Sequence, residues 1–349
     1  MAVWEYEQIT VNGEVVEAQA PIIVSASRST DIPAFYAEWF FDRLEKGYSA
    51  WINPFNGVRS YISYSKTRFI VFWSKNPRPL IPFLPILKRR GIKCYLQFTL
   101  NDYPGLERVP VVEQRIETFK EFSQKLGKQA VIWRFDPLML TKDISIDDLL
   151  LKIQRIGNKI SKFTEKLVFS YADISQYQKV QHNLQAAGIP YLEWTPELMT
   201  EFAERLSNLN REQGWGLQLA TCAEEVDLSA YGIEHNRCID SDLIVKLAWK
   251  DSELMRFLKV KIEEPSLFSL FDDIPGAIAL PDGRYFISVH KKDSGQRKMC
   301  GCCAAKDIGE YNTCMHQCEY CYANTSKSLA ISNWKRHLEC KDAPTITGR

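Results

Sequence analysis

The stretch PIIVSASRSTDIPAFYAEWFFDRLEKG, residues 21–47, contains one complete strand-and-helix unit. Its residues 22–27 form a short apolar run that is typical of a buried strand. Asp31 can cap a helix that has Pro33 in its first turn, and Gly47 can end that helix. A buried strand followed directly by a helix is half of a β–α–β unit, so this stretch predicts a parallel sheet.

The same alternation continues to about residue 221. Further strands are predicted at residues 48–53, 69–74, 94–99, 131–135, 167–171, 191–194 and 216–221, with helical patterns between most of them. Roughly eight strands in about two hundred residues are typical of a TIM-type (β/α) barrel, complete or partial, over residues 21–221. An open doubly wound sheet is the alternative. No strand is followed by a G-x-G-x-x-G or Walker loop, which argues against the nucleotide-binding folds that use them.

The regions around this barrel have different patterns. Residues 1–20 are predicted to be an N-terminal extension, and residues 222–290 an irregular appendage with a small β element around a Pro-Asp-Gly turn. Residues 291–340 are cysteine-rich and are predicted to form a cluster-binding region that caps the barrel. The last nine residues, 341–349, are predicted to be a flexible tail.

Composition describes an ordinary globular chain. Of its 349 residues, 45% are apolar and 25% charged, and the formal net charge is +1, so no global field favours nucleic acid or acidic lipid. From residue 291 onward, 10 Lys and Arg stand against 6 Asp and Glu, a weak indication of an anionic ligand near the tail. No apolar run long enough for a membrane span and no secretory signal is seen, so we expect a cytoplasmic protein with no membrane partner. In that compartment the ten cysteines are not expected to form disulfides, and clustered cysteines more often bind metal or do redox chemistry.

Three of these cysteines stand close together in TCMHQCEYCYAN, residues 313–324. Cys314, Cys318 and Cys321 form a C-x3-C-x2-C array. Three thiolates on one short loop can bind three irons of a cuboidal iron–sulfur cluster and leave the fourth iron open. A structural zinc site more often uses two C-x2-C pairs, or cysteine and histidine at longer separations. His316 could join the three thiolates around zinc, although it is cramped beside Cys314, so both metals stay open and the spacing favours iron–sulfur.

A second set of cysteines is spread along the chain. Four of them could form a second iron–sulfur cluster or a structural zinc site, namely Cys222, Cys238, Cys300 and Cys302, with Cys303 as an alternative ligand. The plainer interpretation is that Cys222 and Cys238 are small buried residues. Cys94 is predicted to lie in the core, and Cys340 is a lone thiol near the C-terminus.

The loop resembles a known signature. C-x3-C-x-Φ-C, with an aromatic residue at Φ, is typical of radical S-adenosylmethionine enzymes, and Tyr320 occupies Φ here. The stretch YNTCMHQCEYCYA is similar to the cluster loop of spore photoproduct lyase and its relatives. Nearly the whole chain resembles an uncharacterised bacterial family with a C-terminal radical-SAM-like cysteine cluster, through stretches such as SASRSTDIPAFY, WRFDP and DIGEYNTC. In radical S-adenosylmethionine enzymes the loop usually follows the first barrel strand, so here the tail would have to fold back over the barrel mouth.

The resemblance implies a particular chemistry. Cys314, Cys318 and Cys321 would hold a [4Fe–4S] cluster, and S-adenosylmethionine would bind its open iron. Reduction of the cluster, by a partner such as ferredoxin or flavodoxin, would yield a 5′-deoxyadenosyl radical that abstracts hydrogen from an unknown substrate. The lyase-like loop suggests a nucleic-acid lesion as substrate, but the neutral charge and the lack of a basic stripe argue against strong duplex binding. A small molecule or a peptide is at least as well supported.

Two other classes of protein remain open. The chain could be a zinc-stabilised barrel that acts as a binding protein, with closed sites of four thiolates or of three thiolates and an imidazole. It could also be an electron-transfer iron–sulfur protein without S-adenosylmethionine. The discriminating feature is the fourth ligand of the loop site, because an open iron favours catalysis and a fourth cysteine favours electron transfer.

Polar residues at the predicted strand ends complete the expected site, because such ends face the active site in a TIM-type barrel. Arg28, Lys75 and Arg134 could bind the carboxylate of S-adenosylmethionine or an anionic substrate. Asp136 and Glu193 could accept hydrogen bonds from its amino or ribose groups. The plainer alternative is that Arg134 and Asp136 form a structural ion pair. In the same way, Asp31 could be only a helix cap.

Overall fold

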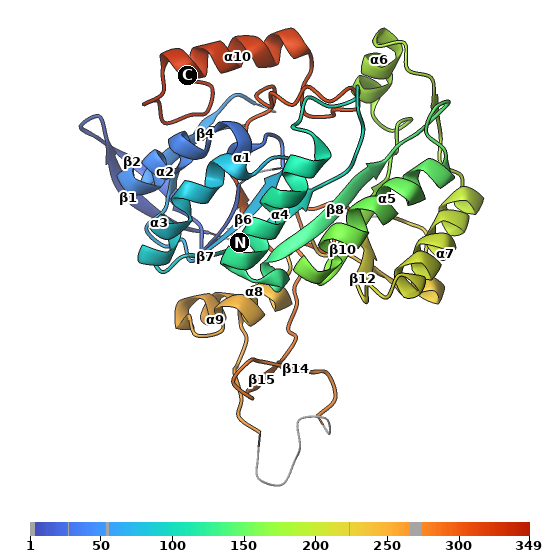
Figure 1. Cartoon of the computed structure of the whole chain (residues 1–349). Helices are drawn as coiled ribbons and strands as arrows, with labels where there is room; N and C mark the ends of the chain where they lie inside the picture. Colours follow the sequence, from blue (N-terminus) through green and yellow to red (C-terminus); the bar gives the residue numbers. More distant parts are fainter. Residues whose placement is uncertain (1–3, 27, 54–55, 223, 266–273) are drawn as a thin grey trace.

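The centre of the molecule is one sheet of eight strands. The structure, a computed structural model, describes residues 4–26, 28–53, 56–222, 224–265 and 274–349, so Ser27 of the first predicted strand lies outside the described residues. Every neighbouring pair of strands in this sheet is parallel (Figure 1). The strand order is β13 (Ile233–His235), β12 (Gln218–Thr221), β10 (Lys166–Tyr171), β8 (Val131–Leu138), β7 (Lys93–Thr99), β6 (Phe69–Ser74), β3 (Ile23–Ala26) and β16 (Lys306–Asp307). The predicted α/β fold is confirmed and is consistent with a partial barrel, since no pairing joins β13 to β16 in the described ranges.

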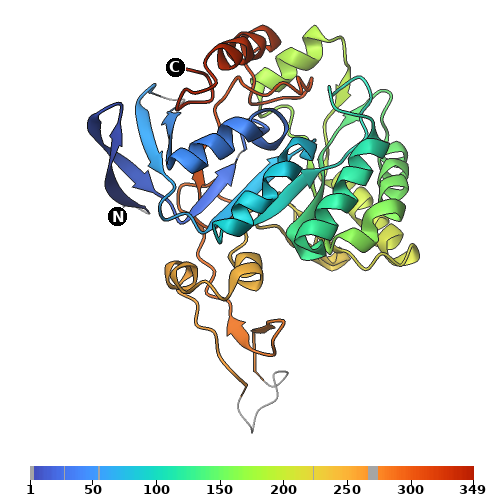
Figure 2. The same cartoon turned by 60° about the vertical axis from the view of Figure 1, so that its left-hand side comes forward.

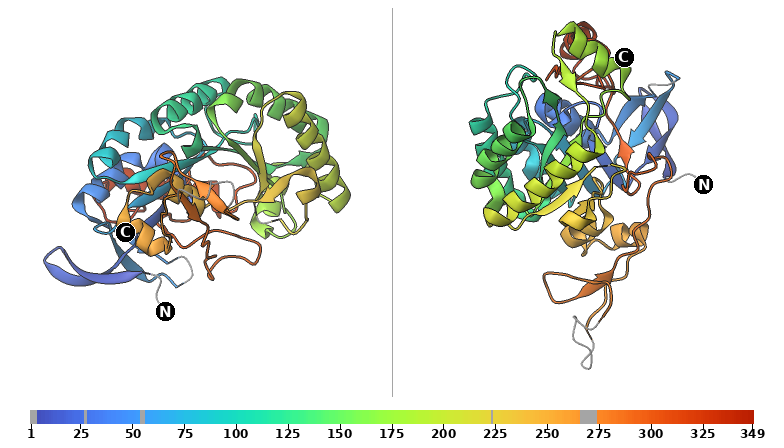
Figure 3. Two further views of the ribbon diagram at one scale, coloured as in Figure 1. Left: turned by 90° about the horizontal axis from the view of Figure 1, so that it is seen from below. Right: turned by 90° about the vertical axis from the view of Figure 1, so that its right-hand side faces the viewer.

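Helices cover the outer face of this sheet. Figure 3 shows them as an arc around the strands, made by α2 (Ala37–Lys46), α3 (Leu84–Arg89), α4 (Val112–Leu126), α5 (Ile146–Ile160) and α7 (Pro196–Glu212). Fully buried side chains such as Val24, Phe98 and Trp133 fill the layer between helices and strands. The remaining helices of the barrel region are α1 (Ile32–Phe35), α6 (Gln178–Ala186) and the short 3-10 turns η1 (Arg78–Phe83), η2 (Lys128–Ala130), η3 (Ser161–Phe163) and η4 (Ser229–Tyr231).

Local sequence signals explain where the first helices begin and end. The Asp31 side chain accepts a hydrogen bond from the Ala34 backbone N–H at 2.9 Å and caps α1. Gly47 ends α2 with a φ of 85°, a left-handed conformation that costs glycine little. Both predicted boundaries are therefore confirmed, although Tyr36 divides the predicted single helix into α1 and α2.

The inner face of the sheet is covered by the segment that follows β13. Helices α8 (Ser241–Ala248) and α9 (Ser252–Leu258) pack there, and Figure 3 shows this part of the chain inside the arc. A second core joins the two layers, with Val71 from the sheet, Ile244 from α8 and Cys302 among its buried members. A hairpin of β14 (Ala277–Ala279) and β15 (Tyr285–Ile287) follows, which confirms the predicted β element.

Two predicted strands lie outside the main sheet. The run at 48–53 forms β4 (Tyr48–Ile52) in a separate sheet with β1 (Glu5–Val11), β2 (Glu14–Ala20) and β5 (Arg59–Ser63), seen beside the main sheet in Figure 2. The run at 191–194 forms β11 (Tyr191–Leu192), which pairs only with β9 (Leu140–Thr141). Strands β13 and β16 complete the main sheet instead. Residues 1–20 thus supply two of the four strands of a small sheet. A short apolar run predicts a strand but does not show which sheet the strand will join.

The predicted flexible tail is packed against the fold. The Ile346 side chain is fully buried, and its backbone N–H donates to Glu310 Oε1 at 2.9 Å. The Ala50 N–H of β4 donates to the Pro344 carbonyl at 2.7 Å. Buried partners such as Glu310 thus fix a terminus that composition alone describes as loose. In the described part of the chain, no helix is long and apolar enough to cross a membrane.

Candidate metal and cofactor site

A cavity of about 400 Å³ opens at the carboxyl ends of the parallel strands. Its walls come from the residues that follow β3, β6, β8, β10 and β12, and from the tail. Seven of the ten cysteines line it, namely Cys222, Cys238, Cys300, Cys302, Cys314, Cys318 and Cys321. The two sets of cysteines that the sequence singles out therefore face one cavity.

The tail reaches this cavity by crossing the ends of the strands. The Arg108 N–H, in the loop between β7 and α4, donates to the His316 carbonyl at 2.9 Å, and the Glu319 N–H donates to the Leu106 carbonyl at the same distance. The Tyr322 hydroxyl donates to the Arg28 carbonyl after β3 at 2.8 Å. Helix α10 (Lys327–Glu339) then lies over the same edge (Figure 1). The loop thus folds back over the sheet, as a C-terminal position requires.

Asp31 and His316 form a buried anchor for the loop. The second carboxylate oxygen of Asp31 accepts from the Lys75 N–H and contacts His316 Nε2, both at 2.7 Å. His316 Nδ1 contacts the Arg108 carbonyl at 3.2 Å. Both ring nitrogens are therefore engaged with the barrel, which leaves neither for a metal in this arrangement. Asp31 is more than a helix cap, because the same carboxylate connects β3, β6 and the tail.

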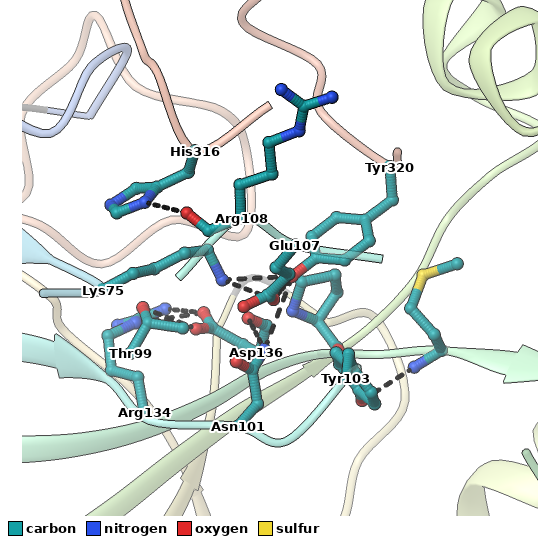
Figure 4. Close-up of polar contacts among 12 residues, drawn as sticks. Lys75, Thr99, Asn101, Tyr103, Glu107, Arg108, Arg134, Asp136, His316 and Tyr320 are labelled. Atoms are coloured by element: carbon teal, nitrogen blue, oxygen red, sulfur yellow. Dashed lines mark hydrogen bonds and ion pairs between the residues drawn. The ribbon is translucent and has the colours of Figure 1, made fainter. Parts of the chain in front are cut away.

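A second anchor surrounds Tyr320 (Figure 4). Lys75 Nζ donates to Glu107 Oε1 at 2.9 Å and to the Tyr320 hydroxyl at 3.0 Å. The Tyr320 hydroxyl itself donates to Glu107, and Asn101 Nδ2 lies 3.5 Å from it. Burial alone would lower the pKa of Lys75, but the charges of Glu107 and Cys318 raise it. The predicted residues Lys75 and Tyr320 thus both contact Glu107, a residue that the sequence did not single out.

Arg134 and Asp136 form the ion pair that the plainer interpretation describes. Arg134 Nε donates to Asp136 Oδ2 at 3.0 Å. Arg134 also reaches beyond this pair, because its Nη1 lies 3.2 Å from Gln97 Oε1 and 3.1 Å from Cys238 Sγ. Both residues also line the cavity. They therefore form a structural ion pair and contribute to the wall of the site.

The thiols of the loop lie close to one another, with Cys318 buried and Cys314 and Cys321 half-buried. Burial raises the pKa of Cys314, and the charges of Asp31 and Cys321 raise it further. Burial likewise raises the pKa of Cys318, even though Lys75 nearby opposes this. A raised pKa favours the protonated thiol at Cys314 and Cys318, and a metal bound there would displace these protons.

Two thiols of the second set are in direct contact. Cys222 Sγ lies 3.2 Å from Cys238 Sγ, and the Ile239 N–H, next in sequence to Cys238, donates to Cys302 Sγ at 3.3 Å. Hydrogen bonds from Cys222 and Cys302 hold the pKa of Cys238 well below its usual value. The contact with Cys302 lowers the pKa of Cys300 to about 6. Cys303, the alternative ligand, packs in the inner core and is not among the described residues that line the cavity.

The remaining predicted residues divide into one inside the site and one outside it. Arg28 lines the cavity, with its Nη1 donating to Gln296 Oε1 at 2.7 Å. Glu193 is exposed and does not contribute to the cavity wall, because β11 belongs to a separate pair of strands. The expectation that Glu193 faces the site is therefore wrong.

Several cavity residues were not predicted. Glu224 follows β12, and burial raises its pKa to about 7. Asp173, also in the cavity wall, has a raised pKa through burial. Both follow parallel strands, where polar residues face the active site of a barrel. Glu107, eight residues beyond the end of β7, was too far along its loop for the strand-end rule to find it.

The donor sets differ from a ready single-ion site. Across the described ranges, no three or more His, Cys, Asp or Glu side chains are grouped as a site for one metal ion. In a tetrahedral zinc site four sulfurs surround one ion at about 2.3 Å each. The ligands of an iron–sulfur cluster bind different irons and stand further apart. Seven thiols line one cavity, which is a donor set that zinc and iron–sulfur clusters both accept.

Comparisons with known proteins give a family and no reaction. The family described as a domain of unknown function, DUF1848, matches residues 23–323. No curated protein and no solved structure matches the chain.

Proposed function

The chain belongs to the DUF1848 family, and from that premise we propose that it is a radical S-adenosylmethionine enzyme. Cys314, Cys318 and Cys321 would hold its [4Fe–4S] cluster. The observation that carries the proposal is that these three thiols, on one short loop, line a cavity at the carboxyl ends of parallel strands. That edge is where barrel enzymes place their chemistry.

The surroundings of the loop support a site with three protein ligands. His316, the nearest candidate for a fourth, is engaged by Asp31 and Arg108. Cys340 is exposed at the end of α10 and does not line the cavity. These contacts count against a closed zinc site with an imidazole ligand. They also count against an electron-transfer cluster closed by the last cysteine.

The cavity offers suitable groups for S-adenosylmethionine. Its volume of about 400 Å³ lies in the range of small-molecule pockets. Lys75 uses two of its three N–H donors on Glu107 and Tyr320, so one remains for a carboxylate. Asp136 Oδ1 has only a 3.4 Å contact from Thr99, which leaves it able to accept from an amino or hydroxyl group. When bound, the cluster and its cofactor would supply a 5′-deoxyadenosyl radical.

The protein's own residues would position this chemistry and exclude water. The Asp31–His316 and Lys75–Glu107–Tyr320 contacts fix the loop against three strand ends, so the thiols are held facing the cavity. The far wall, with Asp173 and Glu224, is left for a substrate. The substrate could be a small molecule, a peptide or, with less support, a nucleic-acid lesion. The electron would come from a reductant such as ferredoxin or flavodoxin.

The test uses anaerobically reconstituted full-length protein. We expect at least four irons per chain, and a low-temperature EPR signal of the reduced protein that changes when S-adenosylmethionine is added. The Cys318→Ala variant should lose the part of the signal that responds to S-adenosylmethionine. The Cys340→Ala variant, which removes an exposed thiol outside the cavity, should keep it. Stoichiometric zinc with no iron, or an unchanged response in Cys318→Ala, would contradict the proposal.

A further inference from the structure

Four thiols outside the loop come together from three separate segments. Cys222 follows β12, Cys238 follows β13, and Cys300 and Cys302 precede β16. Cys222 and Cys238 are in contact at 3.2 Å, the N–H of Ile239 beside Cys238 donates to Cys302 Sγ, and all four cysteines line the cavity. Cysteines that serve only as small apolar residues have no need to meet in this way.

The surroundings of these thiols are polar. Arg134 Nη1 and Asn236 Nδ2 each lie 3.1 Å from Cys238 Sγ. The Ile239 backbone N–H donates to Cys302 Sγ at 3.3 Å. Three N–H donors on two sulfurs favour the thiolate form, and hydrogen bonds of this kind to sulfur also tune bound iron–sulfur clusters.

Arg28 places a half-buried cation beside the thiols, and the nearby Asp307 carboxylate accepts from its backbone N–H at 3.1 Å. The guanidinium of Arg28 donates a hydrogen bond to the neutral Gln296, and no ion pair involves it among the described residues. Its Nε is buried with no hydrogen-bond partner in the same part of the structure. The guanidinium stacks on Trp73 at 5.6 Å, while Arg134 lies over the same ring at 5.3 Å. Asp307 and the cysteines are the anionic groups around this cation, which therefore favours thiolates at Cys300 and Cys302.

From these contacts we propose that Cys222, Cys238, Cys300 and Cys302 hold a second iron–sulfur cluster, in which every iron has a protein ligand. Four cysteines with no other ligand type suit an iron–sulfur cluster, and N–H donors on Cys238 and Cys302 are the contacts that such a cluster uses. Because no iron is open, this cluster would not bind S-adenosylmethionine. The inference does not depend on the proposed reaction at the loop.

The experiment separates the two sites by variants. Wild-type protein, Cys318→Ala and Cys238→Ala are reconstituted anaerobically with iron and sulfide, and iron, sulfide and zinc are counted per chain. We expect each variant to hold about half the iron of the wild type. The signal that remains in Cys318→Ala should not respond to S-adenosylmethionine, and the one that remains in Cys238→Ala should. Cys303→Ala is the matched control, since it removes a neighbouring buried thiol outside the cavity and should keep all the iron.

Cys300→Ser guards against a folding defect, because Cys300 is only half-buried and serine keeps its size. This variant should also lose about half the iron while its far-UV spectrum stays that of the wild type. Full iron in both Cys238→Ala and Cys300→Ser, or zinc in place of iron at this site, would overturn the inference. The proposed function fails by a different result, which is a Cys318→Ala protein with unchanged iron and an unchanged response to S-adenosylmethionine.

Discussion

A single buried ion pair, Lys75 with Glu107, connects the sheet to the loop that carries the three thiols. The Glu107 side chain is fully buried and that of Lys75 is 17% exposed. Removing two charges from water is costly, and the pair compensates for this only through mutual attraction and the added hydrogen bond from Tyr320. The loop therefore depends on both charges being present.

We predict that Lys75→Met lowers the free energy of unfolding by about 3–5 kcal/mol, because it leaves the Glu107 carboxylate buried without its cation. The double variant Lys75→Met/Glu107→Leu should recover much of this loss. Urea denaturation of the wild type, Lys75→Met, Glu107→Leu and the double variant measures it. The exposed pair Lys120 and Glu117 on α4 is the control, and its removal should cost less than about 1 kcal/mol. Additive effects of the two changes at Lys75 and Glu107 would show that the pair is not coupled.

At the scale of elements, the sequence predicts the type and position of a strand or helix better than it predicts which strands pair. Strand β6 has the predicted bounds, and β7 and β10 begin one residue earlier than predicted. The apolar run that forms β4 predicts a strand as clearly as the runs of the main sheet do, yet β4 pairs with β5 outside that sheet. A hydrophobic pattern indicates that a strand is buried but does not indicate which strand it pairs with. Strand β16, only two residues long, is stabilised by its pairing with β3 and has no pattern of its own.

The residues of the site also divide into those that local sequence patterns predict and those that they do not. Close spacing along the chain identifies Cys314, Cys318 and Cys321, and the strand-end rule finds Arg28, Lys75, Arg134 and Asp136. The contact of His316 with Asp31 joins residues 285 positions apart, and that of Tyr320 with Glu107 joins residues 213 apart. Such contacts follow from the path of the tail over the sheet, which no local pattern records.

Helix α10, which lies over the site, is held in part by a buried histidine. His337 Nδ1 contacts the Ile346 carbonyl at 3.0 Å, and its ring packs against Tyr36 and Trp334. Burial lowers the pKa of His337, with Lys341 acting in the same direction and the contact with Ile346 opposing it. The folded protein therefore resists protonation of this ring more than the unfolded chain does.

The sign of the resulting pH dependence follows from linkage. A depressed pKa contributes stability above the unfolded value of about 6.5, and this contribution is lost as the pH falls through the folded pKa. We predict that wild-type stability falls more steeply than that of His337→Phe as the pH drops below about 6.5. Urea midpoints between pH 5 and pH 8 measure this, with the exposed His182→Gln as control. Parallel curves for wild type and His337→Phe would contradict the prediction.

For the whole molecule, the two proposed sites differ in how much of the chain they hold together. The loop site takes all its ligands from eight residues, 314–321. The second site joins the ends of β12 and β13 to the segment before β16, so it connects one edge of the sheet to the strand at the other edge. A ligand set of this kind closes a long stretch of chain that would be free in the unfolded state.

Removing the metal should therefore affect the two sites unequally. By the chain-entropy relation for a cross-link, closing about 60 residues between Cys238 and Cys300 contributes about 4 kcal/mol, against about 2.5 kcal/mol for the loop of eight. We predict that chelation destabilises Cys318→Ala, which retains the second site, by roughly 1–2 kcal/mol more than it destabilises Cys238→Ala, which retains the loop site. Denaturation with and without chelator measures both losses, and Cys303→Ala should lose as much as the wild type. If the two variants lose equal stability, the second set of thiols does not connect the edges of the sheet through a metal.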